Sequence, residues 1–389
     1  MNANKPIRVL QVLTIMNRGG AESMIMNYYR NIDRTKVQFD FLLHRKDKGA
    51  FDDEIKALGG RIYRLDPINP VRFFKYKKEL RHFFKKHQSY SIVHSHLNAL
   101  SSFVLEEARR HGVNIRIAHS HTAVDPKSLN KLLKRHTDRK AIIKKYLQHM
   151  IRQRVARSAT HFLTCSSKAG NWLFPGVPKE RIQILNNAID SSNFQYNQET
   201  RSKIRKVLGL EGKKIIGHVG IFKEEKNHIF LIDIFKNICQ KNNDYHLLLV
   251  GDGPLKEKVK TKVEAEKLTK SVSFLGLRAD IADLLQGMDL FVFPSIYEGL
   301  PVSLIEAQGA GLTIFCSDRV TQEVDITGLI EFIPLKKDPA FWADKILSAP
   351  KYSRKNTLIE LQKGKYDIKE NARLLSDFYL KKYHDLFAK

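Results

Sequence analysis

The stretch FVFPSIYEGLPVSLIEAQGAG (residues 291–311) carries the features that decide the predicted fold. An apolar run typical of a buried strand ends at Pro294, a short turn follows, and a segment with helical apolar spacing begins near Pro301. Proline fits the first turn of a helix, and the glycine two positions before it lets the backbone approach another group closely. A buried strand that leads through a tight turn into a helix is the repeating unit of an α/β fold.

Strand-like and helix-like segments alternate over the rest of the chain. The apolar runs at residues 7–15, 90–96 and 114–121 are predicted strands, and the pattern restarts at residues 213–222. This alternation predicts a parallel sheet in each half, because a parallel crossover requires an intervening segment, usually a helix. We therefore predict an α/β fold of two Rossmann-like, doubly wound parallel-sheet domains that face a central cleft. Ligands are expected at the carboxyl ends of the strands.

The domain boundaries follow from length and composition. A chain of 389 residues is long for a single domain. A polar stretch with weak periodicity, residues 191–212, is predicted to link an N-terminal domain (1–190) to a C-terminal domain (213–366). Residues 367–389 are predicted as a charged amphipathic helix that packs back on the N-terminal domain.

Composition excludes several classes of protein. A hydrophobic fraction of 42% with 28% charged residues is typical of a globular chain, and no apolar run approaches the ~18 residues of a membrane span. The first apolar run is predicted as a buried strand and not as a cleaved signal. The three cysteines show no metal-ligand or redox spacing, which fits a reducing compartment. The predicted location is cytoplasmic, and no cofactor is predicted.

Positive charge is concentrated in the first half. Residues 1–190 carry 36 Lys and Arg against 15 Asp and Glu, net +21, whereas the remainder carries 31 against 26, net +5. Two runs are dense in cations: residues 71–87, with interleaved phenylalanines, and residues 131–157, with ten basic residues and one acid. Such a run is either a solvated helix face or an interfacial helix on an anionic leaflet. Nucleic acid is the less favoured partner, because no recognisable binding motif accompanies the charge, and an anionic membrane surface is the predicted partner.

Two acids stand eight positions apart in the opening stretch, Glu298 in the turn and Glu306 in the helix. Free backbone N–H groups at a helix start, together with the helix dipole, bind anions. A diphosphate there would leave Glu306, roughly 8 Å along the axis, near a ribose, and Glu298 near the hydroxyls of a second sugar. Alternatively, the pair belongs to an ordinary strand, turn and helix. The predicted anion site consists of Gly299, Leu300, Pro301, Val302 and Ser303.

The pattern P-S-x-x-E-G-L-P-x-S-x-x-E-A-x-x-x-G in this stretch resembles the E-x7-E signature of retaining glycosyltransferase family 4. GHVGIFKEEKNH (217–228) resembles that family's phosphate-binding loop, with Lys226 at its basic position. Without the resemblance, Lys226 would be interpreted as a solvated loop lysine. One departure is Ile221, where the family usually has arginine. Lys223 is a candidate substitute, although arginine and lysine bind phosphates differently.

Further segments extend the resemblance over nearly the whole chain. LLLVGDGP (247–254) and VSFLGL (272–277) resemble the family's next two strands. The resemblance makes Gly276 and Leu277, at the end of the second one, substrate-binding candidates. The wording HSHLNALSSFVLEEARRHGVNIRIAHSHT (94–122) is most similar to enzymes of capsular and exopolysaccharide assembly.

A glycine pair follows the first predicted strand. Gly19 and Gly20 lie between that strand and a helix-like segment, and they match neither G-x-G-x-x-G nor G-x-x-x-x-G-K-[ST]. Dinucleotide and P-loop sites are therefore excluded. The resemblance implies that the two glycines belong to the loop that faces the donor phosphate and the acceptor.

Four histidines, His94, His96, His119 and His121, alternate at the ends of two predicted strands. Alternate residues on a strand point the same way, so each pair could supply metal ligands. No further Cys, His or carboxylate cluster completes a set, and no Asp-x-Asp occurs, so no metal is predicted. The resemblance implies instead that His119 or His121 contacts the transferred sugar, and we favour His121. With Glu298, these two are the predicted catalytic residues.

The resemblance implies a GT-B fold and metal-independent transfer, with retention, of a hexosyl or N-acetylhexosaminyl group. The donor would be a nucleoside diphosphate sugar, with a UDP-sugar favoured, and lysine and helix N–H groups would stabilise the leaving diphosphate. The acceptor would be a growing, lipid-linked surface polysaccharide, which places the protein peripherally on the inner face of the plasma membrane. The residues leave two alternatives open: a sugar-nucleotide epimerase or phosphorylase on the same fold, and a non-enzymatic basic nucleic-acid-binding protein.

Overall fold

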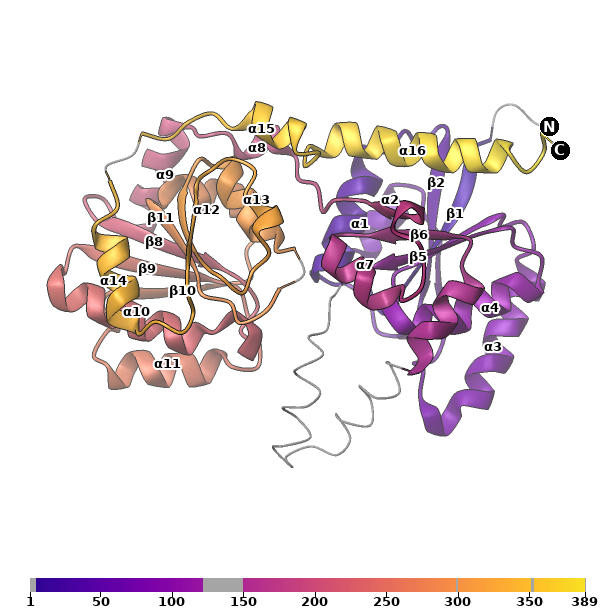
Figure 1. The fold of residues 1–389 in the computed structure, drawn as a ribbon, viewed down its shortest axis with the longest axis horizontal. Helices are drawn as coiled ribbons and strands as arrows, with labels where there is room; N and C mark the ends of the chain where they lie inside the picture. The colour runs from indigo at the N-terminus through magenta and orange to yellow at the C-terminus, as the bar shows by residue number, and fades with distance from the viewer. Residues whose placement is uncertain (1–4, 122–149, 299, 351–352, 389) are drawn as a thin grey trace. The chain divides into compact units, whose positions relative to one another are not determined.

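The computed structural model describes residues 5–121, 150–298, 300–350 and 353–388, and it divides into two compact units (Figure 1). Unit 1 comprises Met1–Ala188 and Ile368–Lys389, and unit 2 comprises Ile189–Asp367. Each unit is built on one parallel sheet flanked by helices. The prediction of two doubly wound α/β domains is therefore confirmed.

Unit 1 contains a seven-stranded sheet in the order β3-β2-β1-β4-β5-β6-β7, and all of its paired strands are parallel. The strands are β1 (Ile7–Leu13), β2 (Val37–Leu43), β3 (Ile62–Arg64), β4 (Ile92–Ser95), β5 (Ile115–Ser120), β6 (His161–Thr164) and β7 (Ile182–Ile184). Its helices are α1 (Gly20–Asn31), α2 (Asp52–Ala57), α3 (Phe73–Lys86), α4 (Ser101–Arg110), α7 (Ser167–Leu173) and α16 (Ile368–His384).

Alternation along the central strands builds two hydrophobic layers in unit 1. In β1, Val9 and Leu13 pack with helices α1, α2 and α16, whereas Leu10 and Val12 pack with α3, α4 and α7. Successive side chains of a strand point to opposite faces, so a strand covered on both sides reads as a continuous apolar run.

The C-terminal helix α16 belongs to unit 1. Its residues Ile368, Ala372, Leu375 and Tyr379 recur at helical spacing and join the hydrophobic layer on one face of the sheet. Figure 1 shows α16, in yellow, lying across α1 and β2. A segment more than 350 residues from β1 along the chain thus completes the core around it.

Unit 2 contains a six-stranded parallel sheet in the order β10-β9-β8-β11-β12-β13, the order of a Rossmann domain. The strands are β8 (Lys214–Val219), β9 (Tyr245–Val250), β10 (Val272–Gly276), β11 (Leu290–Phe293), β12 (Thr313–Ser317) and β13 (Ile330–Ile333). The helices are α8 (Ser191–Phe194), α9 (Gln198–Leu208), α10 (His228–Lys241), α11 (Lys256–Ala265), α12 (Ile281–Gly287), α13 (Val302–Gly309), α14 (Pro339–Leu347) and α15 (Leu358–Lys363).

Residues 191–212, predicted as a linker, contain α8 and α9 and belong to unit 2. Helix α9 buries Ile204, and its Leu208 is partly buried against the core of unit 2. It packs on α12, and the guanidinium groups of Arg201 and Arg205 both bind the carboxylate of Asp289, the residue before β11. Polar contacts therefore add to the apolar contacts that hold α9 in place.

Among the described residues, no helix combines the length and the apolarity that crossing a membrane requires.

Candidate functional site

Two loops meet at the centre of the unit 2 sheet. Strands β8 and β11 are parallel neighbours, so the loops that follow them leave from the same edge. The backbone N–H of Ile296 donates to the carbonyl of Glu225 at 2.8 Å. The side-chain amide of Asn227 donates to the carbonyl of Pro294 at 3.2 Å. These bonds hold the loop after β8, which carries Lys226, against the loop after β11.

Lys226 and Glu298 form an ion pair across these two loops. The distance from Nζ to Oε1 is 2.8 Å, and the side chains are only 14% and 15% exposed. The ammonium also lies 4.6 Å from the ring centroid of Phe293, a cation–π distance. An anion that binds Lys226 must therefore compete with Glu298 for the same charge.

Close packing at two glycines brings the backbone near Lys226. Gly251, at the end of β9, has φ +136°, and a Cβ there would lie 2.1 Å from the carbonyl oxygen of Gly220. Only glycine fits this position. A Cβ at Gly220 would in turn lie 3.2 Å from Cδ of Lys226, so a side chain there would press on the lysine.

The start of α13 lies in the loop that carries Glu298. The helix begins at Val302 with Pro301 as its N-cap, and no side chain in the described part of the chain caps it. Its first-turn N–H groups, those of Val302 and Ser303, are therefore available to an anion. Leu300 is buried in the core of unit 2 and serves packing. Gly299 lies outside the described residues.

Glu306 is the fifth residue of α13, and its side chain is half-buried. No described residue hydrogen bonds to its carboxylate or forms an ion pair with it. Burial raises the pKa of this carboxyl to about 7. Donors from a ligand, such as sugar hydroxyls, would favour the ionised form.

The remaining unit 2 candidates lie along the same sheet edge. Gly276 ends β10 with φ +66°, and the next residue, Leu277, is 64% exposed. Ile221, which stands where the family usually has arginine, is 45% exposed in the loop after β8. The ammonium of Lys223, exposed in the same loop, has no ion-pair partner among the described residues.

In unit 1 the predicted glycine pair begins helix α1. Gly19 is the N-cap without a side-chain hydrogen bond, and no heavy atom lies within 4 Å of a Cβ built at Gly20. The carboxylate of Glu22 folds back over this turn, 2.3 Å from a Cβ built at Gly19. Burial raises the pKa of Glu22. Sequence reasoning missed this acid, although its place in the first turn of a helix was a signal.

The four predicted histidines form one cluster at the ends of β4 and β5, the histidine cluster. His94 Nε2 lies 3.2 Å from His119 Nδ1, and His96 Nδ1 lies 2.7 Å from His121 Nε2. The rings of His119 and His121 stack with centroids 4.1 Å apart. Burial lowers the pKa of all four, that of His121 to about 3, so the rings are neutral at physiological pH.

Two residues that sequence reasoning missed anchor this cluster. The phenol oxygen of Tyr379, on α16, lies 2.6 Å from His94 Nδ1. The side-chain amide of Gln11, on β1, has its oxygen 2.9 Å from His96 Nε2 and its nitrogen 3.3 Å from the Tyr379 oxygen. Both side chains are fully buried. A polar residue within the apolar run of β1 was the available signal for Gln11.

Three of these histidines could hold a metal ion. Ring nitrogens of His94, His96 and His119 lie within 4.8 Å of one another. In the structure, however, both nitrogens of His94 and of His96 are already hydrogen bonded. A cation would have to break these bonds to gain three neutral ligands.

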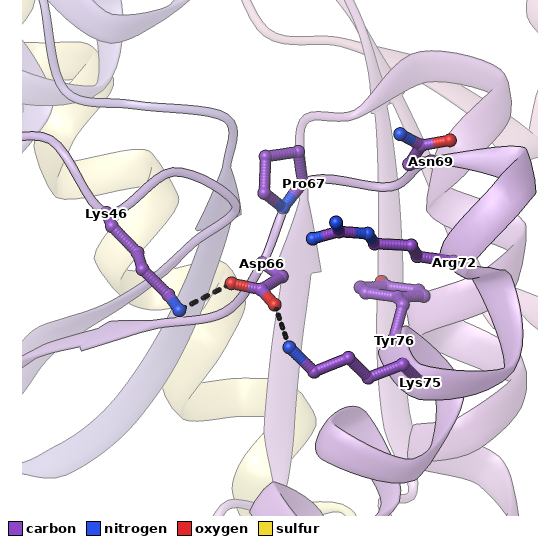
Figure 2. A pocket seen from close by; sticks show the side chains of 7 residues that line it. All are labelled: Lys46, Asp66, Pro67, Asn69, Arg72, Lys75 and Tyr76. Carbon is purple, nitrogen blue, oxygen red and sulfur yellow. Dashed lines mark hydrogen bonds and ion pairs between the residues drawn. The ribbon is translucent and has the colours of Figure 1, made fainter.

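A basic pocket of about 300 Å³ lies near the start of α3 (Figure 2). Lys46 and Lys75 point toward Asp66 from two sides, at 2.6 and 2.7 Å, and they lower the pKa of that carboxyl to about 2. Figure 2 shows Arg72 beside the ring of Tyr76. No described residue forms an ion pair with Arg72, so the pocket has excess positive charge.

Comparison with known proteins identifies the family. A model described as Glycosyltransferase Family 4 matches residues 18–193, and one described as Glycosyl transferases group 1 matches residues 200–349. Putative glycosyltransferase EpsF of Bacillus subtilis is 36% identical over 389 residues, which cover 97% of each chain. The chain belongs to glycosyltransferase family 4. The predicted resemblance is confirmed.

Other similar proteins support the capsular and exopolysaccharide branch of the family and the predicted fold. The capsular polysaccharide biosynthesis glycosyltransferase CapH of Staphylococcus aureus is 28% identical, over 97% of this chain and 99% of CapH. The crystal structure of Anabaena HepE in complex with UDP and glucose superposes with a TM-score of 0.69 and 18% identity, covering 95% of each chain. Sucrose-phosphate synthase of Thermosynechococcus elongatus gives a TM-score of 0.76 and 17% identity, covering 97% of this chain and all of the other. The glycosyltransferase therefore has the GT-B fold.

Proposed function

We propose that this glycosyltransferase moves a hexosyl or N-acetylhexosaminyl group, with retention of configuration, from a nucleoside diphosphate sugar to a growing surface polysaccharide. A UDP-sugar is the favoured donor, because HepE binds UDP and glucose. A lipid-linked acceptor is favoured, because one relative, 25% identical over 72% of this chain, is named as a galactosyltransferase acting on a diphosphoundecaprenol-linked sugar.

The unit 2 loops would hold the donor. The diphosphate would replace Glu298 as the ion-pair partner of Lys226 and would accept hydrogen bonds from the first-turn N–H groups of α13. Glu306 would accept hydrogen bonds from the ribose, and the released Glu298 would contact the transferred sugar. Lysine and the helix start would stabilise the leaving diphosphate without a cation. We propose that His119 and His121 of unit 1 also contact that sugar.

The observation that carries this proposal is the arrangement of the acid-lysine site, defined as Lys226, Glu298, Glu306 and the uncapped start of α13. A lysine paired with a displaceable acid lies next to a helix start and a carboxylate that has no partner among the described residues. This arrangement matches a diphosphate flanked by two sugars. An epimerase could use the same pieces. Transfer to a glycan acceptor, as opposed to interconversion of the free nucleotide sugar, separates the two.

A thermal-shift panel of nucleoside diphosphates and their sugars tests the proposal. One nucleotide and its sugar conjugates should raise the melting temperature selectively, because only ligands of the folded state stabilise it. Lys226→Ala should abolish the shift. The matched control is Lys236→Ala, which removes a lysine that pairs with Glu266 at 2.6 Å elsewhere in unit 2. The proposal fails if no nucleotide is selected, or if both variants respond alike.

We also propose that the start of α3 docks this glycosyltransferase on an anionic membrane. Of the four phenylalanines in residues 71–87, Phe83 and Phe84 are buried in the core, and Phe73 packs on Phe103. Phe74 is 88% exposed, and Val71 is 91% exposed. Val71 and Phe74 are the sequence neighbours of Arg72 and Lys75, which line the basic pocket of Figure 2, so an acyl layer and its phosphates could be contacted together. Residues 131–149 of the second basic run lie outside the described residues.

Vesicle sedimentation checks this docking. Phe74→Ser and Val71→Ser should weaken binding to vesicles that contain phosphatidylglycerol, and Arg72→Gln should weaken it about fivefold, since a basic residue near the surface contributes about 1 kcal/mol. Val207→Ser, at a residue of unit 2 that is 70% exposed, is the matched control and should change nothing. Equal binding of the wild type to neutral and anionic vesicles would contradict the proposal.

A further inference from the structure

Two hydrogen-bonded relays begin at the buried side-chain amide of Gln11. The His121 relay runs from the Gln11 oxygen to His96 and on to His121, over 2.9 and 2.7 Å. The His119 relay runs from the Gln11 nitrogen through Tyr379 and His94 to His119, over 3.3, 2.6 and 3.2 Å. At the far ends, His121 Nδ1 and His119 Nε2 are buried and have no hydrogen-bond partner among the described residues.

The proton positions follow from the chemistry of the amide. The Gln11 oxygen can only accept, so His96 Nε2 carries a proton, His96 Nδ1 accepts from His121 Nε2–H, and His121 Nδ1 keeps a lone pair. In the other relay the amide nitrogen donates to the Tyr379 oxygen. The Tyr379 hydroxyl then donates to His94 Nδ1, His94 Nε2–H donates to His119 Nδ1, and His119 Nε2 carries a proton.

Rotating the amide by 180° reverses both relays together. His119 Nε2 then has the lone pair, and His121 Nδ1 has the proton. An amide has one donating end and one accepting end. The terminal ring nitrogen of one relay is therefore always a donor when that of the other relay is an acceptor, which gives the two relays opposite polarity. In either orientation the four rings share one tautomer, all Nε2–H or all Nδ1–H.

We infer that Gln11 is a positioning residue that gives His119 and His121 one hydrogen-bond donor and one acceptor for the hydroxyl groups of a sugar. The inference rests on the proposed function for the identity of the ligand, and it assigns the new roles to Gln11 and Tyr379. A sugar hydroxyl both donates and accepts, so a donor and an acceptor on stacked rings match its chemistry.

Burial of the cluster supports this assignment. Its low pKa values keep the rings neutral, and only neutral rings have one donor and one acceptor each. His121 is half-buried and His119 is fully buried, so His121 is the more accessible of the two residues. An unpartnered buried nitrogen is costly, so a function that supplies the partner explains why two are present.

The first test is spectroscopic and needs no donor. The full-length protein, labelled with 15N-histidine, gives long-range proton–nitrogen correlations that distinguish the two neutral tautomers, and replacement of each histidine by glutamine assigns its signals. His94, His96, His119 and His121 should share one tautomer. If any of the four differs from the others in the wild type, the inference is overturned.

The variant Gln11→Leu tests whether Gln11 sets the tautomer that the four histidines share. Without the amide, the polarity of one relay no longer determines the polarity of the other. The histidines of at least one relay should then populate both neutral tautomers. Gln38→Leu is the matched control, because Gln38 is a buried glutamine of the adjacent strand β2 that bonds Tyr29. Gln11→Met, which has a similar volume, replaces Gln11→Leu if the latter does not fold. If the wild-type tautomer persists in all four rings, Gln11 does not set it, and the inference is overturned.

Kinetics complete the test. Gln11→Leu should lower kcat/KM for sugar transfer about tenfold, as expected for one hydrogen bond to a hydroxyl, and should leave the Kd of the free nucleoside diphosphate unchanged. Normal transfer by a variant with mixed tautomers would overturn the sugar assignment. Failure of any nucleotide to bind the wild type would instead remove the proposed function, and the tautomer result would still stand.

Discussion

The acid-lysine site of unit 2 and the histidine cluster of unit 1 hold their functional groups by different means. In unit 2 the groups come from two loops and one helix start, they are charged, and Lys226 is paired with Glu298 until an anion replaces it. In unit 1 the groups are neutral and buried, and partners as distant as Gln11 and Tyr379 fix them. A charged leaving group is stabilised by a cation whose resting partner it can displace. A neutral sugar is instead bound by hydrogen-bond donors and acceptors that are held in place.

The largest expected effect is on turnover in the acid-lysine site. Glu298→Gln should lower the transfer rate about a hundredfold to a thousandfold, because the lost carboxylate would contact the sugar as its charge develops. Binding of the free nucleoside diphosphate should be unchanged or tighter, since Lys226 loses its competing partner. Steady-state kinetics and calorimetry measure the two quantities.

Glu266→Gln is the matched control for this prediction. Glu266, the C-cap of α11, also pairs with a lysine of unit 2, Lys236, which lies about two turns along α10 from the loop that carries Lys226. If Glu298→Gln transferred the sugar at the normal rate, the Lys226–Glu298 ion pair would have only a structural role. The proposed contrast between a charged site in unit 2 and a neutral one in unit 1 would then be lost.

A smaller effect is expected from pH, and only at the charged site. The pKa of Glu306 is raised to about 7 by burial, and ribose hydroxyls that donate to the carboxylate would lower it in the complex. Nucleoside diphosphate affinity should therefore be full above about pH 7 and should fall, by up to about tenfold per pH unit, below it. Calorimetry from pH 5.5 to 8 measures this.

In Glu306→Gln the component due to this carboxylate should vanish, which separates it from protonation of the diphosphate. Because the rings of the histidine cluster titrate at much lower pH, they should add nothing over this range. An unchanged pH profile in Glu306→Gln would assign the titration to another group.

The smallest expected effect is that of metal ions. Activity with a chelator should match activity with added Mg²⁺ or Mn²⁺, because lysine and N–H groups are proposed to stabilise the leaving diphosphate. A loss on chelation that Zn²⁺ reverses would point to His94, His96 and His119 and would make the two sites more alike.

The two regions also differed in how far the sequence could predict them. The parallel α/β architecture followed from local alternation of apolar runs, and the family from motifs such as E-x7-E, because both lie in contiguous segments. The candidate residues Glu298, Glu306 and Lys226 were named in this way. Contacts between residues far apart in the sequence gave weaker signals in the sequence pattern. The bond between Tyr379 and His94 joins residues 285 positions apart, and helical periodicity explains the burial of Tyr379 but not its partner.

The structure also changed the interpretation of residues 191–212 and 71–87. Two polar residues of helix α9, Arg201 and Arg205, bind Asp289, a residue of a distant segment that composition cannot reveal. For residues 71–87, the interleaved phenylalanines and cations predicted either a solvated helix face or an interfacial helix on an anionic leaflet. The fold uses Phe83 and Phe84 for its core and leaves Phe74 exposed.

The central claim, that unit 2 binds the nucleotide while the histidine cluster binds the sugar, is tested most directly by two variants and two ligands. His121→Gln keeps a donor for His96 and removes the free Nδ1, and Glu306→Gln removes the predicted ribose contact. Calorimetry gives the Kd of the nucleoside diphosphate and of its sugar conjugate for each. We predict that Glu306→Gln weakens both ligands alike, by about ten- to a hundredfold, whereas His121→Gln weakens only the conjugate. Equal loss of both ligands in His121→Gln would contradict the account.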